Sequence, residues 1–219
     1  MKKAWYIYII GMAALLAACS GEEAADAVGY LSLTDLAVTC EGEALPLSKA
    51  VDAGLQVQVC QGETVVHDYA PGTDLSRRVA LPVGTYVVKA FTPDQAEAAD
   101  NVAGHPVYSI VSDAFAITDG DLTTLSLVAP QVNVGVKAVF DANTLADFPS
   151  ASLTLTAATG RTVTIGSGNA DTYYYFSRPA DGRIDYTIRV TNADGEAFSR
   201  DGALTSVEAK NYAVAVRLD

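Results

Sequence analysis

Histidine and cysteine, on which most metal and nucleophile sites depend, are scarce in this chain. Its 219 residues include two histidines and three cysteines. His67 and His105 lie in different predicted elements and lack the spacing of a metal-binding pair. The sequence also lacks a Gly-x-Ser-x-Gly elbow, a glycine-rich phosphate loop and a Cys-x-x-Cys motif. These absences predict no metal, no cofactor and no catalytic site, and we expect a protein that is not an enzyme.

Two observations leave open a metal or catalytic site that no sequence motif reveals. Asp119 and Asp121 resemble a fragment of a calcium loop, but the full EF-hand pattern is absent and a turn explains both aspartates better. Carboxylates scattered through the sequence can also converge in the folded chain, as they do in glycosidases. The sequence alone does not decide whether they converge here.

Basic residues are few relative to acidic ones. The chain has 14 Lys and Arg against 26 Asp and Glu, a formal charge of −12. Residues 1–18 contain Lys2 and Lys3 and no acid. The net charge of the remaining chain is therefore more negative than that of the full chain. No basic cluster offsets this charge, which excludes nucleic acid as a partner. We expect the acidity to serve solubility at a cell surface.

Long apolar runs are absent except at the start of the chain. The segment from Ala4 to Ala18 is uncharged and mostly apolar. It is shorter than the roughly 20 residues of a membrane-spanning helix, but it has the form of a cleaved export signal. It ends in Leu16-Ala17-Ala18-Cys19, which resembles a bacterial lipobox, so we expect a signal peptide over 1–18 and acylation of Cys19, for example by palmitate. An ordinary signal peptide with a chance cysteine is the alternative.

The two remaining cysteines are Cys40 and Cys60. An exported chain occupies an oxidising compartment, where a disulfide between them is permitted. Each cysteine ends a predicted strand, and consecutive antiparallel strands place such ends at opposite edges of a sheet. A bridge requires Cα atoms within about 7 Å of each other. A Cys40–Cys60 disulfide and two buried thiols therefore stay open as alternatives.

Nearly everything after a polar spacer, residues 19–29, has the period-two pattern of β-strands. Ile184, Tyr186, Ile188 and Val190 alternate with polar residues, which is typical of antiparallel sheets with one buried face. The pattern predicts two sets of seven strands. They span 30–39, 55–60, 64–69, 76–81, 84–92, 107–117 and 122–129, then 132–140, 152–158, 161–165, 171–177, 183–191, 195–200 and 208–218.

Turn residues separate these strands. Asp119-Gly120 and Asp194-Gly195 are hairpin signals, because glycine tolerates the positive φ of a type I′ turn, and Ala158-Thr159-Gly160-Arg161 predicts a third hairpin. The segments 93–104 and 141–148 can each hold a helical turn, but we expect ordered loops. Pro130-Gln131 marks a domain boundary, because proline cannot join a central ladder. We therefore expect an all-β protein with two antiparallel seven-stranded β-sandwiches, over 30–130 and 131–219.

Tyr173-Tyr174-Tyr175-Phe176 is the candidate contact site. In a strand, Tyr173 and Tyr175 face one way while Tyr174 and Phe176 face the other, so only one pair enters the core. Outward tyrosines can stack on sugars or bind a protein partner. Cover by a loop or by the first sandwich is the alternative. The chain has one tryptophan, Trp5 in the predicted signal peptide, which weakens a sugar-binding interpretation.

Several segments together are similar to fimbrillin-like surface lipoproteins of gut-dwelling Gram-negative anaerobes, including an uncharacterised branch of them. Leu81-Pro82-Val83-Gly84-Thr85-Tyr86 resembles a turn of transthyretin-like sandwiches. The other segments are Gly29-Tyr30-Leu31-Ser32-Leu33, Pro106-Val107-Tyr108, Phe115 to Asp121 and Val132-Asn133-Val134. The similarity covers roughly residues 1–145. It implies a transthyretin-like or Ig-like first sandwich and a role as a fimbrial shaft, tip or anchor subunit or as an adhesin.

The resemblance also implies where the protein resides. Cys19-Ser20-Gly21-Glu22-Glu23 looks like the acidic tag of lipoproteins on the outer surface, so we expect a lipid anchor in the outer membrane with the chain facing the exterior. Polymerising fimbrillins are cut at an arginine after the first strand. Here the segment 41–54 offers only Lys49, and Arg77-Arg78 lie further along, which argues against polymerisation triggered by a protease.

These expectations define two functional hypotheses. The first is a non-catalytic, fimbria-associated or adhesin-like subunit, with fimbrial subunits or a host ligand as partners. The second is a glycan-binding lipoprotein of a polysaccharide uptake system.

Overall fold

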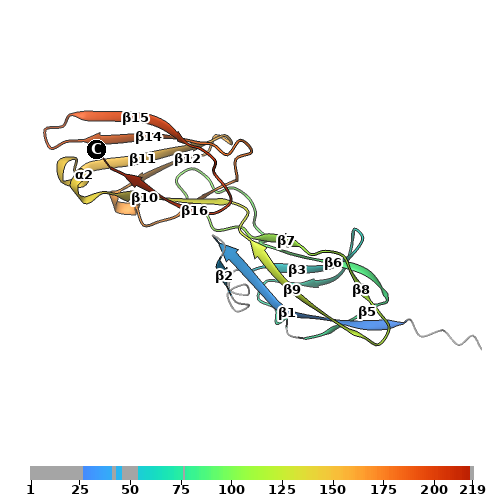
Figure 1. Cartoon of the computed structure of the whole chain (residues 1–219). Helices are drawn as coiled ribbons and strands as arrows, with labels where there is room; N and C mark the ends of the chain where they lie inside the picture. Colours follow the sequence, from blue (N-terminus) through green and yellow to red (C-terminus); the bar gives the residue numbers. More distant parts are fainter. Residues whose placement is uncertain (1–26, 41–42, 46–53, 76, 218–219) are drawn as a thin grey trace, which may run out of the picture.

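The computed structural model describes residues 27–40, 43–45, 54–75 and 77–217, which form two β-rich domains placed end to end (Figure 1). We name them by the limits predicted from the sequence, the N-terminal domain over 30–130 and the C-terminal domain over 131–219. Cys19 and the predicted signal peptide lie outside the described residues, so the predicted anchor is not visible. In the described part of the chain, no helix is long and apolar enough to cross a membrane.

The N-terminal domain consists of two facing sheets. In the first sheet, β1 (Val28–Cys40) pairs with β9 (Leu122–Pro130) on one side and with β2 (Glu43–Leu45) and β5 (Val79–Pro82) on the other. The second sheet has the order β4 (Thr64–Tyr69), β3 (Gln56–Gln61), β6 (Gly84–Phe91), and β6 also pairs with β7 (Ser109–Val111) and β8 (Phe115–Ile117).

The C-terminal domain has a four-stranded and a three-stranded sheet. The four-stranded sheet has the order β12 (Thr162–Gly166), β11 (Ser150–Ala157), β14 (Ile184–Thr191), β15 (Ala197–Leu204). The three-stranded sheet has the order β13 (Tyr174–Phe176), β10 (Val134–Phe140), β16 (Asn211–Val216). A helix, α2 (Ala142–Asp147), and a 3-10 turn, η1 (Ser167–Asn169), connect strands.

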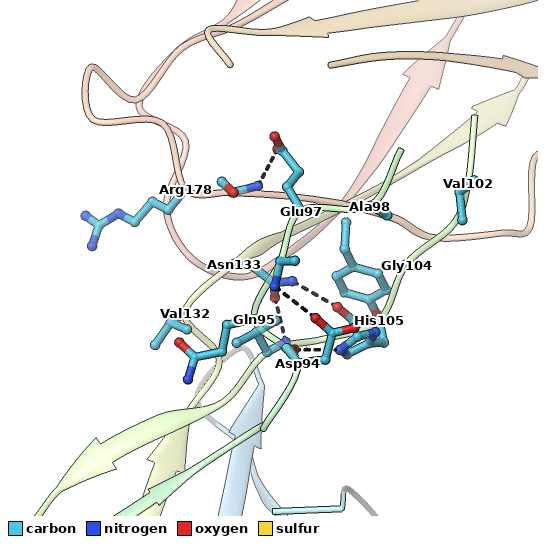
Figure 2. Close-up of a pocket in the computed structure, with 14 residues that line it drawn as sticks. Asp94, Gln95, Glu97, Ala98, Val102, Gly104, His105, Val132, Asn133 and Arg178 are labelled. Atoms are coloured by element: carbon cyan, nitrogen blue, oxygen red, sulfur yellow. Dashed lines mark hydrogen bonds between the residues drawn. The ribbon is translucent and has the colours of Figure 1, made fainter. Parts of the chain in front are cut away.

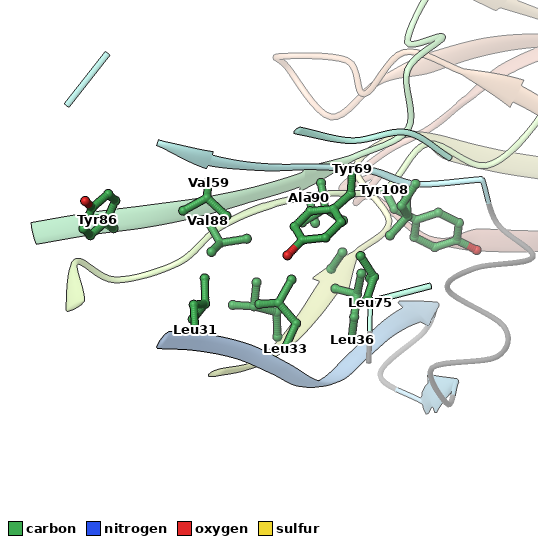
Figure 3. Packing of buried hydrophobic residues seen from close by; sticks show 14 of the residues in the cluster. Leu31, Leu33, Leu36, Val59, Tyr69, Leu75, Tyr86, Val88, Ala90 and Tyr108 are labelled. Atoms are coloured by element: carbon green, nitrogen blue, oxygen red, sulfur yellow. The ribbon is translucent and has the colours of Figure 1, made fainter. Parts of the chain in front are cut away.

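Each domain buries its own apolar cluster between its sheets. In the N-terminal domain, Leu31, Leu33 and Leu36 of β1 face Val88 and Ala90 of β6 across the core (Figure 3). In the C-terminal domain, the alternating residues of β10, β11, β12 and β14 meet in a second cluster. Its most buried members are Val134, Val136, Leu153, Leu155, Val163, Ile165, Phe176 and Ile184. The period-two pattern thus identified the buried faces, and the all-β fold class is confirmed.

Two expectations about the sheets are corrected. The pairing is not wholly antiparallel, since β1 runs parallel to β9 and β10 runs parallel to β16. Alternation fixes which face of a strand is buried, but it does not fix the direction of the neighbouring strand. Within its described residues, the N-terminal domain has nine strands where seven were expected, because Glu43–Leu45 adds one and the predicted strand 107–117 is divided. At the division, the Ser112 hydroxyl accepts the Val88 N–H at 2.9 Å in place of a ladder carbonyl.

The turn predictions succeed in two of three places. Asp194-Gly195 joins β14 to β15 and Ala158–Arg161 joins β11 to β12, each in an antiparallel hairpin as predicted. Asp119-Gly120 does not form a hairpin, because β8 pairs with β6 while β9 pairs with β1. Its turn, with Gly120 at φ +72°, instead carries the chain from one sheet to the other.

The loop predictions succeed at 93–104, which contains no helix, and are wrong at 141–148. There α2 forms because the Asp141 carboxylate accepts the N–H groups of Asn143 at 2.9 Å and Thr144 at 3.2 Å. These bonds satisfy two donors that the first turn of a helix leaves free.

Candidate functional site

The aromatic segment predicted as a contact site forms β13 and the residue before it. Tyr174 and Phe176 point into the core, with 6% and 0% of their surface exposed, while Tyr173 and Tyr175 are half-buried on the other side. The Tyr174 hydroxyl accepts a hydrogen bond from the Asn169 amide at 2.7 Å. The structure therefore has the alternation that the sequence predicted, and it places Tyr173 and Tyr175 on the side of β13 away from the core.

Tyr173, Tyr175 and Lys137 form a surface that we call the tyrosine face. The two rings have centroids 6.3 Å apart and planes inclined by 37°. The ammonium group of Lys137, on β10, lies 5.1 Å from the centroid of the Tyr173 ring, within the range of a cation–π contact. Val139, which follows two residues later on the same face, is 47% exposed. The tyrosine face thus combines aromatic and cationic groups, and the exposed Val139 adjoins it.

Gly135 makes room for this arrangement. It lies directly opposite Tyr175 in the pairing of β10 with β13. A Cβ at this position would lie 2.9 Å from Cε1 of Tyr175 and would overlap Oδ1 of Asn211 on β16. The absence of a side chain therefore lets the Tyr175 ring lie over β10, beside the Asn211 amide.

A cleft of about 380 Å³ adjoins Tyr175 where the two domains meet (Figure 2). Its walls come from the segment after β6, from the residues between β9 and β10, and from the residues around β13. The most polar of the lining residues are Asp94, Gln95, Glu97, His105, Asn133 and Arg178. The cleft is of the size at which proteins bind small ligands, and domain interfaces are a common place for such sites.

Asn133 organises the floor of the cleft. Its Oδ1 accepts the Val107 N–H at 2.9 Å, and its Nδ2 donates to the His105 carbonyl at 2.9 Å (Figure 2). Nε2 of His105 lies 3.0 Å from the Asp94 carbonyl oxygen. These bonds join the segment before β7 to the residues that enter β10, so the floor is built from both domains.

Residues 97–104 form a second connection, which we call the docking segment. The Glu97 carboxylate accepts the Ser177 N–H at 2.7 Å, and the Ala103 carbonyl accepts the Tyr175 N–H at 2.9 Å. These two bonds lie along the outer edge of β13. They place the docking segment beside the Tyr175 backbone and fix one wall of the cleft.

The docking segment also covers the outer edge of β12. The Asp100 carboxylate accepts the Thr162 N–H at 2.8 Å, and the Asn101 amide oxygen accepts the Thr164 N–H at 2.8 Å. The Asn101 N–H donates to the Thr162 carbonyl at 3.2 Å. One segment of the N-terminal domain therefore satisfies edge groups in both sheets of the C-terminal domain.

Arg161 fastens the docking segment. Its side chain is buried, with the residue 5% exposed, and its guanidinium donates to the carbonyls of Ala99 and Val102. The guanidinium carbon lies 4.6 Å from the centroid of the Phe176 ring. Burial lowers the pKa of Arg161, while the negative charges of Glu97 and Asp100 act in the opposite direction. Within the described residues, Nη1 of Arg161 has no hydrogen-bond partner.

These groups support binding. Within the described ranges, no cluster of three His, Cys, Asp or Glu side chains could hold a metal ion. The cleft offers hydrogen-bonding amide, carboxylate and guanidinium groups, and the tyrosine face offers an aromatic surface.

Sequence reasoning named the four residues from Tyr173 to Phe176 without deciding which pair faces outward, and it missed Lys137, Arg161 and the docking segment. The cluster of Asp, Asn and Glu residues between Pro93 and Gly104 was the available signal, because such side chains often bond to backbone groups. Cys60 is buried. The side chain of Cys40 lies outside the described residues, so a Cys40–Cys60 disulfide and two buried thiols both stay open as alternatives.

Comparison with known proteins yields one family and several distant structural neighbours. The model of a domain of unknown function, DUF4493, matches residues 27–219. No curated protein matches the chain. A proposed adhesin from Bacteroides ovatus is 9% identical, with 87% of this chain and 93% of that chain covered and a TM-score of 0.43. A proposed cell adhesion protein from the same species is 9% identical, with 84% and 92% covered and a TM-score of 0.41. A DUF3823 family protein from Parabacteroides merdae is 14% identical, with 82% and 99% covered and a TM-score of 0.25.

Proposed function

The chain belongs to the DUF4493 family, a family of unknown function, and we propose that it is a non-catalytic, adhesin-like protein of the cell surface. In this proposal, acylated Cys19 anchors the chain in the outer membrane and the two domains extend outward. The tyrosine face then binds a protein partner, either a fimbrial subunit or a host surface protein. The resemblance of several segments to fimbrillin-like lipoproteins supports this class of function.

The observation that carries the proposal is the composition of the tyrosine face. Two tyrosines that share one side of β13 remain half-buried, although every other aromatic side chain of that strand is buried in the core. Tyrosine is among the residues that contribute most to protein interfaces, since a large ring and a polar hydroxyl share one stiff side chain. Lys137 adds a charge that is favoured next to an aromatic ring and can pair with a partner's carboxylate.

A pull-down from the native envelope tests the partner. The protein without its signal peptide, fixed on beads, should recover fimbrial subunits or a defined surface protein, and Tyr173→Ala, Tyr175→Ala and Lys137→Ala should each reduce recovery. Tyr30→Ala is a matched control, because Tyr30 in the N-terminal domain makes a similar contact with Arg78, whose guanidinium carbon is 4.8 Å from the ring centroid. Equal loss with Tyr30→Ala, or no loss with the three variants, would refute a role for the tyrosine face.

A second candidate function is glycan binding, favoured by the cleft beside Tyr175. Gln95, Glu97 and Arg178 present amide, carboxylate and guanidinium groups that can bond sugar hydroxyls next to an aromatic ring. A glycan array with the purified protein tests this function. Binding that is lost in Tyr175→Ala and in Arg178→Ala would favour the glycan over the protein partner.

The anchor is tested separately by mass spectrometry of the protein extracted from membranes. We expect an N-terminal cysteine that carries acyl chains, and we expect Cys19→Ser to release the chain from the membrane fraction. Retention of the Cys19→Ser protein by membranes would contradict the anchor but not the binding role of the tyrosine face.

A further inference from the structure

The outer strands of the C-terminal domain differ in how their edges are covered. The docking segment bonds to the outer edges of β12 and β13. β15 is the other outer strand of the four-stranded sheet, and within the described residues it pairs only with β14. Figure 1 shows it at the outer margin of the domain, on the side away from β12. An uncovered edge presents N–H and C=O groups to which another strand can bond.

The pairing of β14 with β15 identifies the outward groups. The hairpin bond from the Asn192 N–H to the Glu196 carbonyl, 3.0 Å long, fixes the alternation along β15. Accordingly, the backbones of Ala197, Ser199, Asp201 and Ala203 point away from β14. No other part of the described chain bonds to these outward backbone groups.

A small apolar pocket of about 120 Å³ lies behind this edge. Ile188 and Val190 of β14, Phe198 of β15 and Val216 of β16 contribute to its walls, and Thr144 of α2 lies among them. Phe198 is 53% exposed and contacts Phe148 edge to face, with the ring centroids 5.9 Å apart. The edge therefore offers an incoming strand both backbone hydrogen-bonding groups and an apolar pocket for its side chains.

Two arginines line the same pocket, and Arg200 gives it a charge preference. Arg200 lies opposite the inward-facing Ile188, so it shares the inner face of the sheet with Phe198. Arg217, which follows β16, is exposed. Asp201 is on the opposite face, where its carboxylate accepts the Thr187 hydroxyl at 2.6 Å. A strand that adds to β15 thus meets positive charge on the inner face, in a chain that is acidic overall.

We propose that the β15 edge accepts an extended strand of another protein, with a carboxylate residue opposite Arg200 and apolar residues on either side of it on the same face. Main-chain bonds to the outward groups would supply affinity, and the pocket and Arg200 would supply specificity. Arg200 excludes apolar strands that lack an acid, because their addition would desolvate the guanidinium without a partner.

A second copy of β15 fits this edge poorly. Two copies paired antiparallel about a two-fold axis normal to the sheet must place residues of the same face opposite each other. The two registers with the most overlap then place Arg200 against its own copy, or Asp201 against its own copy. Like charges directly opposite each other destabilise strand pairing. The occupant is therefore a different strand, one with an acid where β15 has a base.

Synthetic peptides test the proposal on the protein without its signal peptide. One probe is the acetylated and amidated peptide TVTETVT, whose valines and central glutamate share one face, and the control replaces the glutamate by lysine. We expect the glutamate peptide to bind about tenfold more tightly, and we expect Arg200→Glu to reverse the preference. Hydrogen exchange should slow at Ser199, Asp201 and Ala203, while the outer edge of β12 stays unchanged.

Several results would overturn the proposal. Equal binding of the two peptides, binding without protection of β15, or no binding of either peptide would each do so. Protection of β15 that rises with protein concentration in the absence of peptide would also contradict it, by showing that a second copy occupies the edge. Loss of the peptide preference in Arg200→Glu leaves the tyrosine face unaffected, so this test and that of the proposed function can fail independently.

Discussion

Replacing Arg161 by methionine removes the buried cation that fastens the docking segment to the C-terminal domain. Methionine has similar length and tolerates an apolar site beside Phe176, so the change mainly removes the bonds to the Ala99 and Val102 carbonyls. Leaving a buried acceptor without a donor costs about 1–3 kcal/mol. Methionine also removes the desolvation penalty of the buried charge and of Nη1, which has no hydrogen-bond partner among the described residues. This gain offsets part of the cost. We expect a net loss of about 2 kcal/mol.

Two measurements check this value. Circular dichroism during thermal unfolding should show a midpoint lower by about 5 °C, since 1 kcal/mol corresponds to about 2–4 °C in a chain of this size. A glutamate-specific protease should cut faster after Glu97, because the docking segment opens more often. Trypsin is unsuitable for this purpose, since residues 93–104 contain no Lys or Arg.

Arg183→Met is the matched control. Arg183 is an arginine of the same domain whose side chain is 53% exposed and pairs with exposed Asp185. An exposed pair of this kind contributes about 0–1 kcal/mol, so its loss should barely move the midpoint or the cleavage at Glu97. If Arg161→Met and Arg183→Met behave alike, the buried guanidinium of Arg161 does not hold the docking segment against the C-terminal domain.

Three further predictions concern single positions. Gly135→Ala should weaken binding by the tyrosine face and alter the near-UV dichroism of its tyrosines, because a Cβ would overlap the Asn211 amide and press on the Tyr175 ring; an unchanged spectrum would contradict the packing over β10. Burial raises the pKa of Tyr86 above its ordinary value of 10.0, so the unfolded chain ionises first and stability should fall as the pH rises above 10. Tyr86→Phe should lose less stability than the natural chain between neutral pH and pH 11 in urea titrations, although it also loses the 2.8 Å bond to the Pro82 carbonyl. Asp141→Ala should lower stability by about 1 kcal/mol in the same assay through loss of the α2 N-cap, while Asp141→Asn should retain most of it.

The sequence predicted the strands well and their partners poorly. The alternation from Ile184 to Val190 gave the position and the buried face of β14 almost to the residue, because burial of one face imposes period two. The parallel pairing of β10 with β16 left no comparable mark, because the same alternation suits either strand direction. Asp119-Gly120 shows the same limit, since its turn chemistry is local while the choice of sheet depends on packing across the whole domain.

The sequence predicted the aromatic residues of the candidate site but not Arg161. The sequence indicated that two of the four aromatics from Tyr173 to Phe176 face outward, because four successive aromatics cannot all enter one core, but only the structure shows that they are Tyr173 and Tyr175. Arg161 was not predicted, since it ends a hairpin turn in the sequence and its acceptor, the Ala99 carbonyl, lies 62 residues earlier. Backbone carbonyls are present at every residue, so no sequence pattern distinguishes the ones that bind a buried arginine.

The contacts of Tyr175 connect the stability of the domain junction with the proposed binding role. Its N–H bonds to Ala103 of the docking segment, and its ring lies over Gly135 of β10. A displaced docking segment would therefore release the Tyr175 backbone, leave the outer edge of β13 open and change the wall of the cleft at once. The Arg161 guanidinium bonds to the carbonyls of Ala99 and Val102, which lie outside the tyrosine face, yet its replacement should lower binding by the tyrosine face as well as stability. Binding that stays intact in an Arg161→Met protein with faster cleavage at Glu97 would show that the tyrosine face is organised by the C-terminal domain alone.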